Sequence, residues 1–363
     1  MRLPTVPKQI YVNGRFLTQT TTGVQRYARE TLDAMDVLLD GEAKTKWTVL
    51  TPKGIAFQRK WKNIEMRTVG RLSGHAWEQL ELPRYASDGW LLTLCGAPSF
   101  LHSSHLFAIH DTAIYDMPMG YSFLYRAYYR ILYRLCVNRA KVIFTVSEFS
   151  RSRLAALFPN AAGEIVITYG GADHLGNATE VRPTDAVVTS TRPYPYILAV
   201  SSLAPNKNFP LIFELAELLE GADVRILVVG AMNSSVFAKT DVSSSNISWL
   251  GYVSDDELER LYRHAACFVF PSLYEGFGLP PIEAMSLGCP VIASNAASIP
   301  EVCGNAALYF NPSSALELKS QFLRLLHESD LAEELRRRGD QQAKKFTWIQ
   351  VALIINNVIA HLS

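Results

Sequence analysis

Two carboxylates and two glycines lie close together in the stretch 268–283, FVFPSLYEGFGLPPIE. An apolar run leads into Gly276 and Gly278, and the two prolines that follow can start a helix. A strand, a glycine-rich bend and a new helix N-terminus present free backbone N–H groups and the positive end of a helix dipole, which suits a phosphate. Glu275 and Glu283 would repel that phosphate. We therefore expect the carboxylates to bind neutral groups rich in hydroxyls, such as a sugar and a ribose.

The rest of the sequence predicts two α/β domains that would position this stretch. The chain has 363 residues, 48% of them hydrophobic, which is enough for two cores of ordinary size. Short apolar, β-branched runs alternate with helical stretches, a pattern typical of parallel sheets covered by helices on both faces. The runs of the first half are 9–12, 47–50, 91–95, 106–110 and 142–147, and those of the second half begin at 196, 224, 247, 267, 290 and 306.

The predicted domain order follows from composition and periodicity. We expect a first domain over 1–175, a linker over 176–195 and a second domain over 196–346. The linker stretch is polar, contains prolines and lacks periodicity. The segment 347–363 predicts an amphipathic C-terminal helix, capped by Thr347, that crosses back to the first domain.

Charge, cysteine content and hydropathy argue against several classes of protein. The formal net charge of +1 does not suggest wholesale binding to nucleic acid. The five cysteines lie far apart without CxxC pairs, which predicts reduced core thiols in a cytoplasmic protein. No apolar run approaches the roughly 18 residues that a spanning helix needs. We therefore expect a soluble or peripheral protein.

Several segments together resemble one enzyme family. The central motif is Glu275 and Glu283 on either side of GFGLPPI. Further resembling segments are 284–312, LGYVSDDEL at 250–258, the surroundings of Lys207 and Asn208, and in the first half TGVQRYARE, the pair His110 and Asp111, VSEFSRSRL and GGAD at 170–173. These segments resemble the GT4 family of retaining glycosyltransferases over nearly the whole chain. The resemblance implies the GT-B fold, in which two Rossmann-like domains with parallel sheets face a central cleft.

The resemblance implies roles for four charged or titratable residues. Glu275 corresponds to the acid that contacts the hydroxyls of the transferred sugar, and Glu283 to the acid that holds the ribose of the nucleotide. Lys207 falls where the family has a diphosphate-binding lysine, and His110 matches a first-domain histidine that faces the reacting sugar. The resemblance thus implies His110, Glu275 and Lys207 as the catalytic set.

Other positions would surround the donor. The resemblance and the local patterns together suggest donor contacts at Gly23, Ser202, Asn206, Tyr252, Val253, Gly276, Phe277, Gly278 and Leu279. Gly23 is also open to interpretation as a plain turn glycine. The sequence departs from the family at Ser201, Ser202 and Asn206, where many relatives have a Gly-Arg or Gly-Thr pair and an arginine. One expected cation is therefore missing near the diphosphate.

The resemblance also implies a reaction. A hexose, with mannose favoured, would move with retention from a nucleoside-diphosphate sugar to a glycan or lipid-linked acceptor, as in surface polysaccharide or O-antigen synthesis. GDP-sugars are favoured over UDP-sugars as donors. The family is thought to use front-face attack, in which the departing phosphate accepts the proton of the acceptor hydroxyl. Because the sequence contains no Asp-x-Asp, we expect neither a metal nor any other cofactor.

Three alternatives remain beside this interpretation. A sugar-nucleotide epimerase or hydrolase would consume the donor without an acceptor, and a non-catalytic sugar-nucleotide or glycan-binding module would only bind it. A dinucleotide-dependent oxidoreductase is disfavoured, because Pro281 occupies the third glycine position of the fingerprint and the motif lies far from the first βα turn.

The segment 121–141, YSFLYRAYYRILYRLCVNRAK, predicts a helix with a basic and aromatic face. Arg126, Arg130 and Arg134 are four residues apart and share one side of that helix. Such a face suits an anionic membrane and a lipid-linked acceptor at the inner face of the plasma membrane. The alternative is a surface helix whose aromatic residues belong to the core and whose arginines are solvated or paired.

Overall fold

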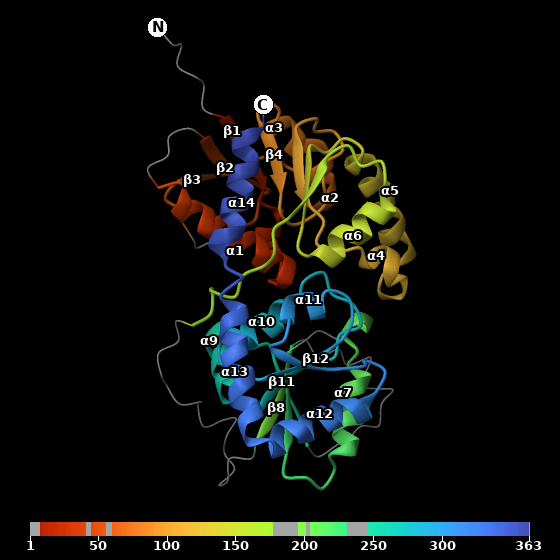
Figure 1. Ribbon diagram of the computed structural model, residues 1–363. Coiled ribbons are helices and arrows are strands. Elements are labelled where there is room, and N and C mark those ends of the chain that lie inside the picture. The colour runs from red at the N-terminus through yellow and green to blue at the C-terminus, as the bar shows by residue number, and fades with distance from the viewer. Residues whose placement is uncertain are drawn as a thin grey trace. The chain divides into compact units, whose positions relative to one another are not determined.

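The computed structural model describes residues 8–40, 45–55, 60–176, 195–200, 204–230 and 246–362. The chain divides into two compact units, each built around one parallel β-sheet (Figure 1). The first unit contains Met1–Gly170 and Trp348–Ser363, and the second contains Gly171–Thr347. Within the described ranges, no helix combines the length and the apolar character that a membrane span needs.

The first unit has a seven-stranded sheet in the order β3-β2-β1-β4-β5-β6-β7. Its strands are β1 (Lys8–Asn13), β2 (Thr45–Thr51), β3 (Ile64–Thr68), β4 (Trp90–Thr93), β5 (His105–Ala108), β6 (Val142–Thr145) and β7 (Glu164–Ile167). The central strands are buried on both faces, as their continuous apolar runs predict. Strand order reverses between β1 and β4, and ligands of open α/β sheets bind beyond the carboxyl ends of strands at such a point.

The sequence runs predicted five strands of this sheet and missed β3 and β7. Both missed strands form the edges of the sheet, and most of their residues are exposed or half-buried. An edge strand with a solvated face has no continuous apolar run, so this signal is absent there.

Seven α-helices of the described chain belong to the first unit, together with short 3₁₀ turns and a π-helix at Trp77–Glu81. The α-helices are α1 (Gly23–Leu38), α2 (Gly74–Ala76), α3 (Leu82–Tyr85), α4 (Ala113–Asp116), α5 (Phe123–Val137), α6 (Glu148–Leu157) and α14 (Trp348–His361). The C-terminal α14 packs on α1, where the rings of Tyr27 and Trp348 meet edge to face at 5.8 Å. Lys8 Nζ also donates to the carbonyl of Ile359 over 2.9 Å, which ties α14 to the start of β1.

The second unit has a six-stranded sheet in the order β10-β9-β8-β11-β12-β13, and all six strands match predicted runs. Its strands are β8 (Tyr196–Val200), β9 (Arg225–Val229), β10 (Ile247–Gly251), β11 (Cys267–Phe270), β12 (Val291–Ser294) and β13 (Ala307–Phe310). Its helices are α7 (Pro210–Leu218), α9 (Asp255–His264), α10 (Leu279–Ser286), α11 (Ile299–Cys303), α12 (Ala315–His327) and α13 (Ser329–Ala343). Strand order reverses between β8 and β11.

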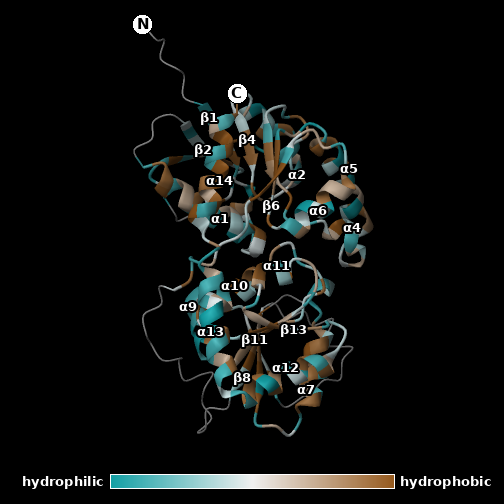
Figure 2. Cartoon of the chain, in the orientation of Figure 1, coloured by the Kyte–Doolittle hydropathy of each residue, from teal (hydrophilic) through white to brown (hydrophobic). Residues whose placement is uncertain are grey.

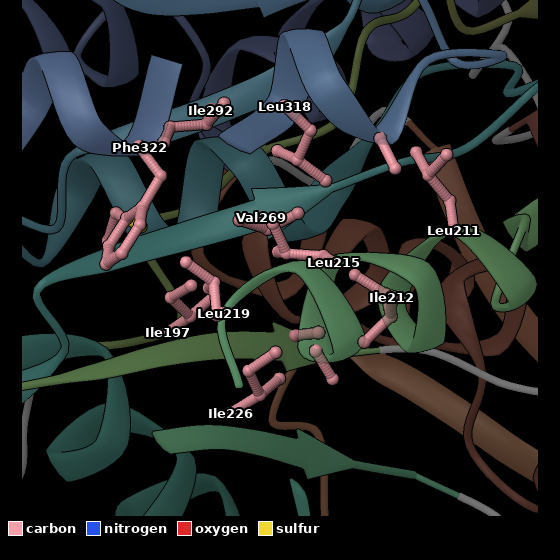
Figure 3. Packing of buried hydrophobic residues seen from close by; sticks show 14 of the residues in the cluster. Ile197, Leu211, Ile212, Leu215, Leu219, Ile226, Val269, Ile292, Leu318 and Phe322 are labelled. Carbon is pink, nitrogen blue, oxygen red and sulfur yellow. The ribbon is translucent and has the colours of Figure 1, made fainter. Parts of the chain in front are cut away.

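Apolar side chains of α7 and α12 form the core on one face of this sheet. Figure 3 shows them packed against β8, β9, β11 and β12, and Ile212 of α7, Leu318 of α12 and Val269 of β11 are fully buried. In Figure 2 the strands β6, β11 and β13 are hydrophobic, whereas α9 and α13 carry many hydrophilic residues. This contrast between buried strands and solvated covering helices is what the alternating pattern predicts.

The boundary between the units lies a few residues before its predicted position. Residues 171–175, which the sequence placed in the first domain, belong to the second unit. Contacts with the second unit hold them there, including the hydrogen bond from Ala172 N to the carbonyl of Phe346 and, at the next residue, the bond from Gly176 N to Glu259 Oε2. The predicted linker over 176–195 lies outside the described residues except at its two ends.

All five cysteines are buried and free. Burial raises the thiol pKa of Cys95, Cys136, Cys289 and Cys303 to about 12, which keeps these thiols protonated and unreactive at neutral pH. The cysteines therefore belong to the core, as the sequence predicted.

Candidate functional site

The glycine-rich loop joins β11 to α10 at the carboxyl edge of the second sheet. Gly278 caps α10 with φ of +109°, a left-handed conformation that strongly favours glycine. The buried Ser298 donates from Oγ to the carbonyl of Glu275 over 3.0 Å and to that of Phe277 over 2.9 Å. Because these carbonyls are held by Ser298, the loop has a defined conformation from which α10 starts.

Lys207 and Glu275 form an ion pair beside this loop, with Nζ 2.7 Å from Oε1. Lys207 ends a 3₁₀ turn, Pro205–Lys207, in the connection after β8. Since β8 and β11 are neighbours where the strand order reverses, their following loops meet at one edge. The side chains keep 25% and 12% of their surface exposed, so both charges are reachable by a ligand.

Asn206, predicted as a donor contact, forms hydrogen bonds to the glycine loop. Its side-chain amide donates to the backbone carbonyl of Tyr274 over 3.1 Å, and its backbone carbonyl accepts from Leu273 N over 2.7 Å. These two bonds tie the Lys207 turn to the glycine loop. Asn206 therefore holds the ion-paired turn against the loop.

Glu283 lies in the second turn of α10 and is only 6% exposed. Its Oε1 is 3.2 Å from Nε2 of His174, and its Oε2 accepts a long, 3.5 Å hydrogen bond from the hydroxyl of Tyr262. A buried carboxylate needs such polar partners, because desolvation penalises its charged form. Sequence reasoning found Glu283 and missed both partners.

The other predicted donor contacts of this unit follow the same sheet edge. Phe277 is buried, and the centre of its ring is 5.3 Å from that of Phe346. Its side chain therefore belongs to the core, while its backbone forms part of the glycine-rich loop. Tyr252 follows β10 and is 73% exposed, and Val253 beside it is half-buried. Ser202 lies outside the described residues.

His110 follows β5 at the carboxyl edge of the first sheet. Its Nε2 is 2.8 Å from the carbonyl of Leu94, and since a carbonyl can only accept, Nε2 carries the hydrogen. The ring of Tyr27 meets it edge to face at 4.7 Å. Burial lowers the pKa of His110 to about 4, although the bond to the Leu94 carbonyl opposes the shift. At neutral pH the imidazole is therefore neutral, with Nδ1 as an acceptor.

Gly23 is the first residue of α1, after the cap residue Thr22. It is exposed, and its φ is not positive, so the backbone alone does not require glycine there. Tyr27, one turn later in α1, contacts His110. The structure thus brings the start of α1 close to His110, as both positions lie at the carboxyl edge of the first sheet.

Comparison with known proteins found a family model and several relatives that match parts of the chain. Residues 184–346 match the family model described as glycosyl transferases group 1. The chain is also 32% identical over 255 residues to O-antigen chain mannosyltransferase B of Escherichia coli, a match that covers 66% of this chain and 65% of that protein. Residues 184–346 thus belong with the group 1 glycosyltransferases, and the chain is similar to them beyond that range.

A second relative of this chain is O-antigen chain mannosyltransferase RfbU of Salmonella typhimurium, 30% identical over 208 residues. That match covers 56% of each protein, so the chain spans between about half and two thirds of these curated relatives.

Solved structures of other proteins have the same fold as this chain. WaaG, a glycosyltransferase involved in lipopolysaccharide biosynthesis, superimposes with a TM-score of 0.71 at 15% identity, covering 98% of this chain and all of that one. Sucrose-phosphate synthase of Thermosynechococcus elongatus gives a TM-score of 0.74 at 15% identity, covering 98% of each chain. The expectation of a GT-B fold is thereby confirmed.

One polar network of the first unit was not found from the sequence. The fully buried Glu78, on the π-helix, accepts from Asn13 Nδ2 over 3.0 Å and pairs with Arg15 over 2.5 Å and with His75 over 2.9 Å. The network ties the end of β1 to α2 and the π-helix. The sequence has no motif that links these positions, because their contacts depend on the sheet order.

Helix α5 contains the arginines of the predicted basic face of the segment 121–141, in different environments. Arg130 donates to the carbonyl of Ile114 over 3.0 Å, and its guanidinium lies 5.0 Å from the ring centre of Tyr115, so it faces the protein. The exposed stripe of α5 is aliphatic: Leu124, Ile131 and Leu135 are 79%, 63% and 45% exposed. Of the three predicted arginines, Arg130 faces the protein and Arg134 is exposed, and a repeat of four residues in the sequence does not distinguish these two environments.

Proposed function

We propose that this protein is a retaining glycosyltransferase that moves a hexose, favoured as mannose, from a nucleoside-diphosphate sugar to a glycan or lipid-linked acceptor in surface polysaccharide synthesis. The observation that carries the proposal is the ion pair of Lys207 and Glu275 beside the glycine loop and the N-terminus of α10. The names of the two O-antigen mannosyltransferase relatives support the mannose donor and the glycan acceptor.

The proposed donor site divides the charges between two chemical groups. Lys207, the backbone N–H groups from Gly276 to Leu279 and the N-terminus of α10 would hold the diphosphate. Glu275 would accept bonds from sugar hydroxyls while it keeps Lys207 oriented, and Glu283 would hold the ribose. Since Asn206 serves as a clamp, the backbone N–H groups would carry the share of charge that an arginine carries in relatives.

The proposed reaction is front-face displacement without a metal or other cofactor. The bond from the anomeric carbon to the phosphate oxygen breaks, the bond to the acceptor oxygen forms on the same face, and the acceptor proton passes to the departing phosphate. The main requirement is then stabilisation of charge on the diphosphate, which preorganised donors can supply. For His110 we keep its predicted role at the reacting sugar, as a neutral imidazole.

The donor is tested by thermal shift with GDP, UDP, GDP-mannose, UDP-glucose and other sugar nucleotides, followed by product analysis with and without a glycan acceptor. Stabilisation by GDP and GDP-mannose, and transfer only with acceptor, are the expected results. Donor consumption without acceptor indicates an epimerase or hydrolase, and binding without turnover indicates a binding module. Full transfer after EDTA treatment is expected, and loss that Mg²⁺ restores would refute the metal-free mechanism.

We also propose peripheral contact with the inner face of the plasma membrane through α5. Its aliphatic stripe, Leu124, Ile131 and Leu135, has the exposure that insertion into the interface requires. Arg134 and Arg139 are exposed near the stripe and would attract anionic lipid. This arrangement would bring a cytoplasmic enzyme to a lipid-linked acceptor.

A further inference from the structure

The segment 171–176 is anchored to the second unit by its backbone. Ala172 N donates to the carbonyl of Phe346 over 3.3 Å, and Gly176 N donates to Oε2 of Glu259 over 2.9 Å. Glu259 is itself 2% exposed and pairs through Oε1 with Arg263 at 2.6 Å. These hydrogen bonds anchor the backbone before and after His174, and they thereby fix the position of that residue.

His174 points into the same buried environment as Glu283. Its side chain is 3% exposed, and Nε2 lies 3.2 Å from Glu283 Oε1. Tyr262 contacts the other carboxylate oxygen at 3.5 Å. The carboxylate is therefore held from two sides by residues from two different segments, the anchored stretch and α9.

We infer that His174 is a positioning residue that orients Glu283 for the two hydroxyls of the donor ribose. Each carboxylate oxygen has two lone pairs, about four acceptor sites in all. Nε2 of His174 lies beside Oε1 and the Tyr262 hydroxyl donates to Oε2, so each oxygen keeps at least one acceptor site for one of two neighbouring hydroxyls. The inference rests on the proposed function, because it assumes that Glu283 meets a ribose.

A purely structural role makes a different prediction from a positioning role. If His174 only compensates a buried charge, its loss weakens the fold and every ligand of the unit alike. If His174 orients Glu283, its loss affects only ligands whose ribose carries hydroxyls. A nucleotide pair that differs in those hydroxyls therefore separates the two roles.

The test compares GDP with 2′,3′-dideoxy-GDP by isothermal titration calorimetry on the full chain. The wild type is expected to bind GDP at least tenfold more tightly, since hydrogen bonds to a charged group contribute about 1.5–3 kcal/mol. His174→Ala is expected to lose about tenfold in GDP affinity and less than twofold for the dideoxy nucleotide, which reduces the discrimination correspondingly. His174→Gln, whose amide can donate to the carboxylate, is expected to restore part of the discrimination.

Controls separate folding from positioning. Circular dichroism and melting temperature check that each variant is folded. His264→Ala removes an exposed histidine at the end of α9, whose Nδ1 bonds to the Arg260 carbonyl, and is expected to leave both affinities unchanged. If the wild type favours UDP, UDP and its dideoxy analogue replace the guanosine pair.

The outcomes distinguish this inference from the proposed function. Wild-type discrimination that persists fully in His174→Ala, or an equal loss for both nucleotides, overturns the positioning role and leaves the proposed function standing. A wild type that binds nucleoside diphosphates without regard to the ribose hydroxyls overturns the role of Glu283 and the inference together. A wild type that binds neither GDP nor UDP refutes the proposed function and the inference with it.

Discussion

At the scale of single residues, the ion pair of Lys207 and Glu275 is the most specific feature of the candidate site. The two residues belong to loops after neighbouring strands and meet at 2.7 Å. Both are partly exposed, so their attraction contributes little to stability. Their arrangement is more informative about ligand binding, since the cation and the carboxylate lie side by side next to the glycine loop and the N-terminus of α10.

We predict that Lys207→Ala and Glu275→Ala each reduce transfer by roughly 100-fold or more, which is the scale seen when one preorganised charge-stabilising group is removed. The melting temperature should change little. Lys344→Ala is the matched control, because Lys344 forms an exposed ion pair with Asp340 in the same unit. Initial rates with saturating acceptor measure the effect. Near-normal turnover of either site variant would show that the pair is not part of the catalytic set.

The neutral His110 has a consequence for acid stability. Its pKa, about 4 in the fold, lies below the value of about 6.5 expected when unfolded. Between those values the unfolded chain binds the proton and the native chain does not, so stability falls as pH drops from about 6.5 to about 4. His110→Gln cannot take up that proton. The wild type should therefore lose more free energy of unfolding than His110→Gln between pH 7 and pH 4.

Urea titrations at pH 7, 6, 5 and 4 measure this difference directly. His105 has a pKa lowered by burial to about 3, so it adds acid sensitivity of the same sign to both proteins. It therefore cancels in the comparison. Parallel pH curves for the wild type and His110→Gln would contradict the lowered pKa of His110.

At the scale of elements, α10 depends on a glycine at its start. Gly278 has φ of +109°, whereas a β-carbon there would meet no atom closer than 3.8 Å. The constraint is therefore backbone conformation and not space. Any other residue would shift the loop whose N–H groups are proposed to face the diphosphate.

We predict that Gly278→Ala lowers the affinity for GDP by about tenfold or more, because an unfavourable backbone conformation costs about 1–3 kcal/mol or is relieved by moving the loop. Gly288→Ala is a close control: Gly288 follows α10 at its other end, with φ of +73° and open space around it. Both variants should lose stability, and only Gly278→Ala should lose nucleotide binding. Calorimetric titration and thermal melts measure the two effects, and equal affinities would argue against the loop as the phosphate site.

The aliphatic stripe of α5 leads to a prediction about membranes. Ile131→Ser combined with Leu135→Ser should reduce co-sedimentation with vesicles of phosphatidylglycerol and phosphatidylethanolamine by about tenfold or more, since burying each such side chain contributes roughly 1.5–3 kcal/mol. Leu316→Ser is the control, because Leu316 is 69% exposed on α12 of the other unit. Equal sedimentation of all three proteins, or binding insensitive to anionic lipid and salt, would rule out this surface.

At the scale of the whole molecule, α14 returns the chain to the first unit after the second is complete. Five of its residues are buried: Trp348, Val351, Ala352, Ile355 and Ile359. They cover α1, whose Tyr27 contacts both Trp348 and His110. The end of the chain thus supports a residue of the candidate site.

We predict that Trp348→Ala destabilises the first unit by about 3–5 kcal/mol, as expected for a large side chain removed from a core. Differential scanning calorimetry should show the transition of this unit at a lower temperature. Leu353→Ala is the control, because Leu353 is 42% exposed on the same helix. An unchanged transition would show that α14 is not required for the first unit.

The two parallel α/β units and the C-terminal helix were predictable because their signals are local. Eleven apolar runs correspond to the eleven strands other than β3 and β7, and a serine cap at Ser254 starts α9 as its sequence predicts. The loop that carries Glu275 and Glu283 was recognisable for the same reason, since its glycines, prolines and acids lie within one short stretch.

The contacts that give those residues their chemistry were decided by the tertiary structure. Lys207 and Glu275, 68 residues apart, meet because β8 and β11 are neighbours in the sheet. His174 reaches Glu283 because the backbone next to it is anchored to α9. Arg130 faces inward because it donates to the Ile114 carbonyl and lies over the ring of Tyr115. A local pattern determines whether a segment is strand, turn or helix, but strand order and packing determine which distant side chains meet and which face is buried.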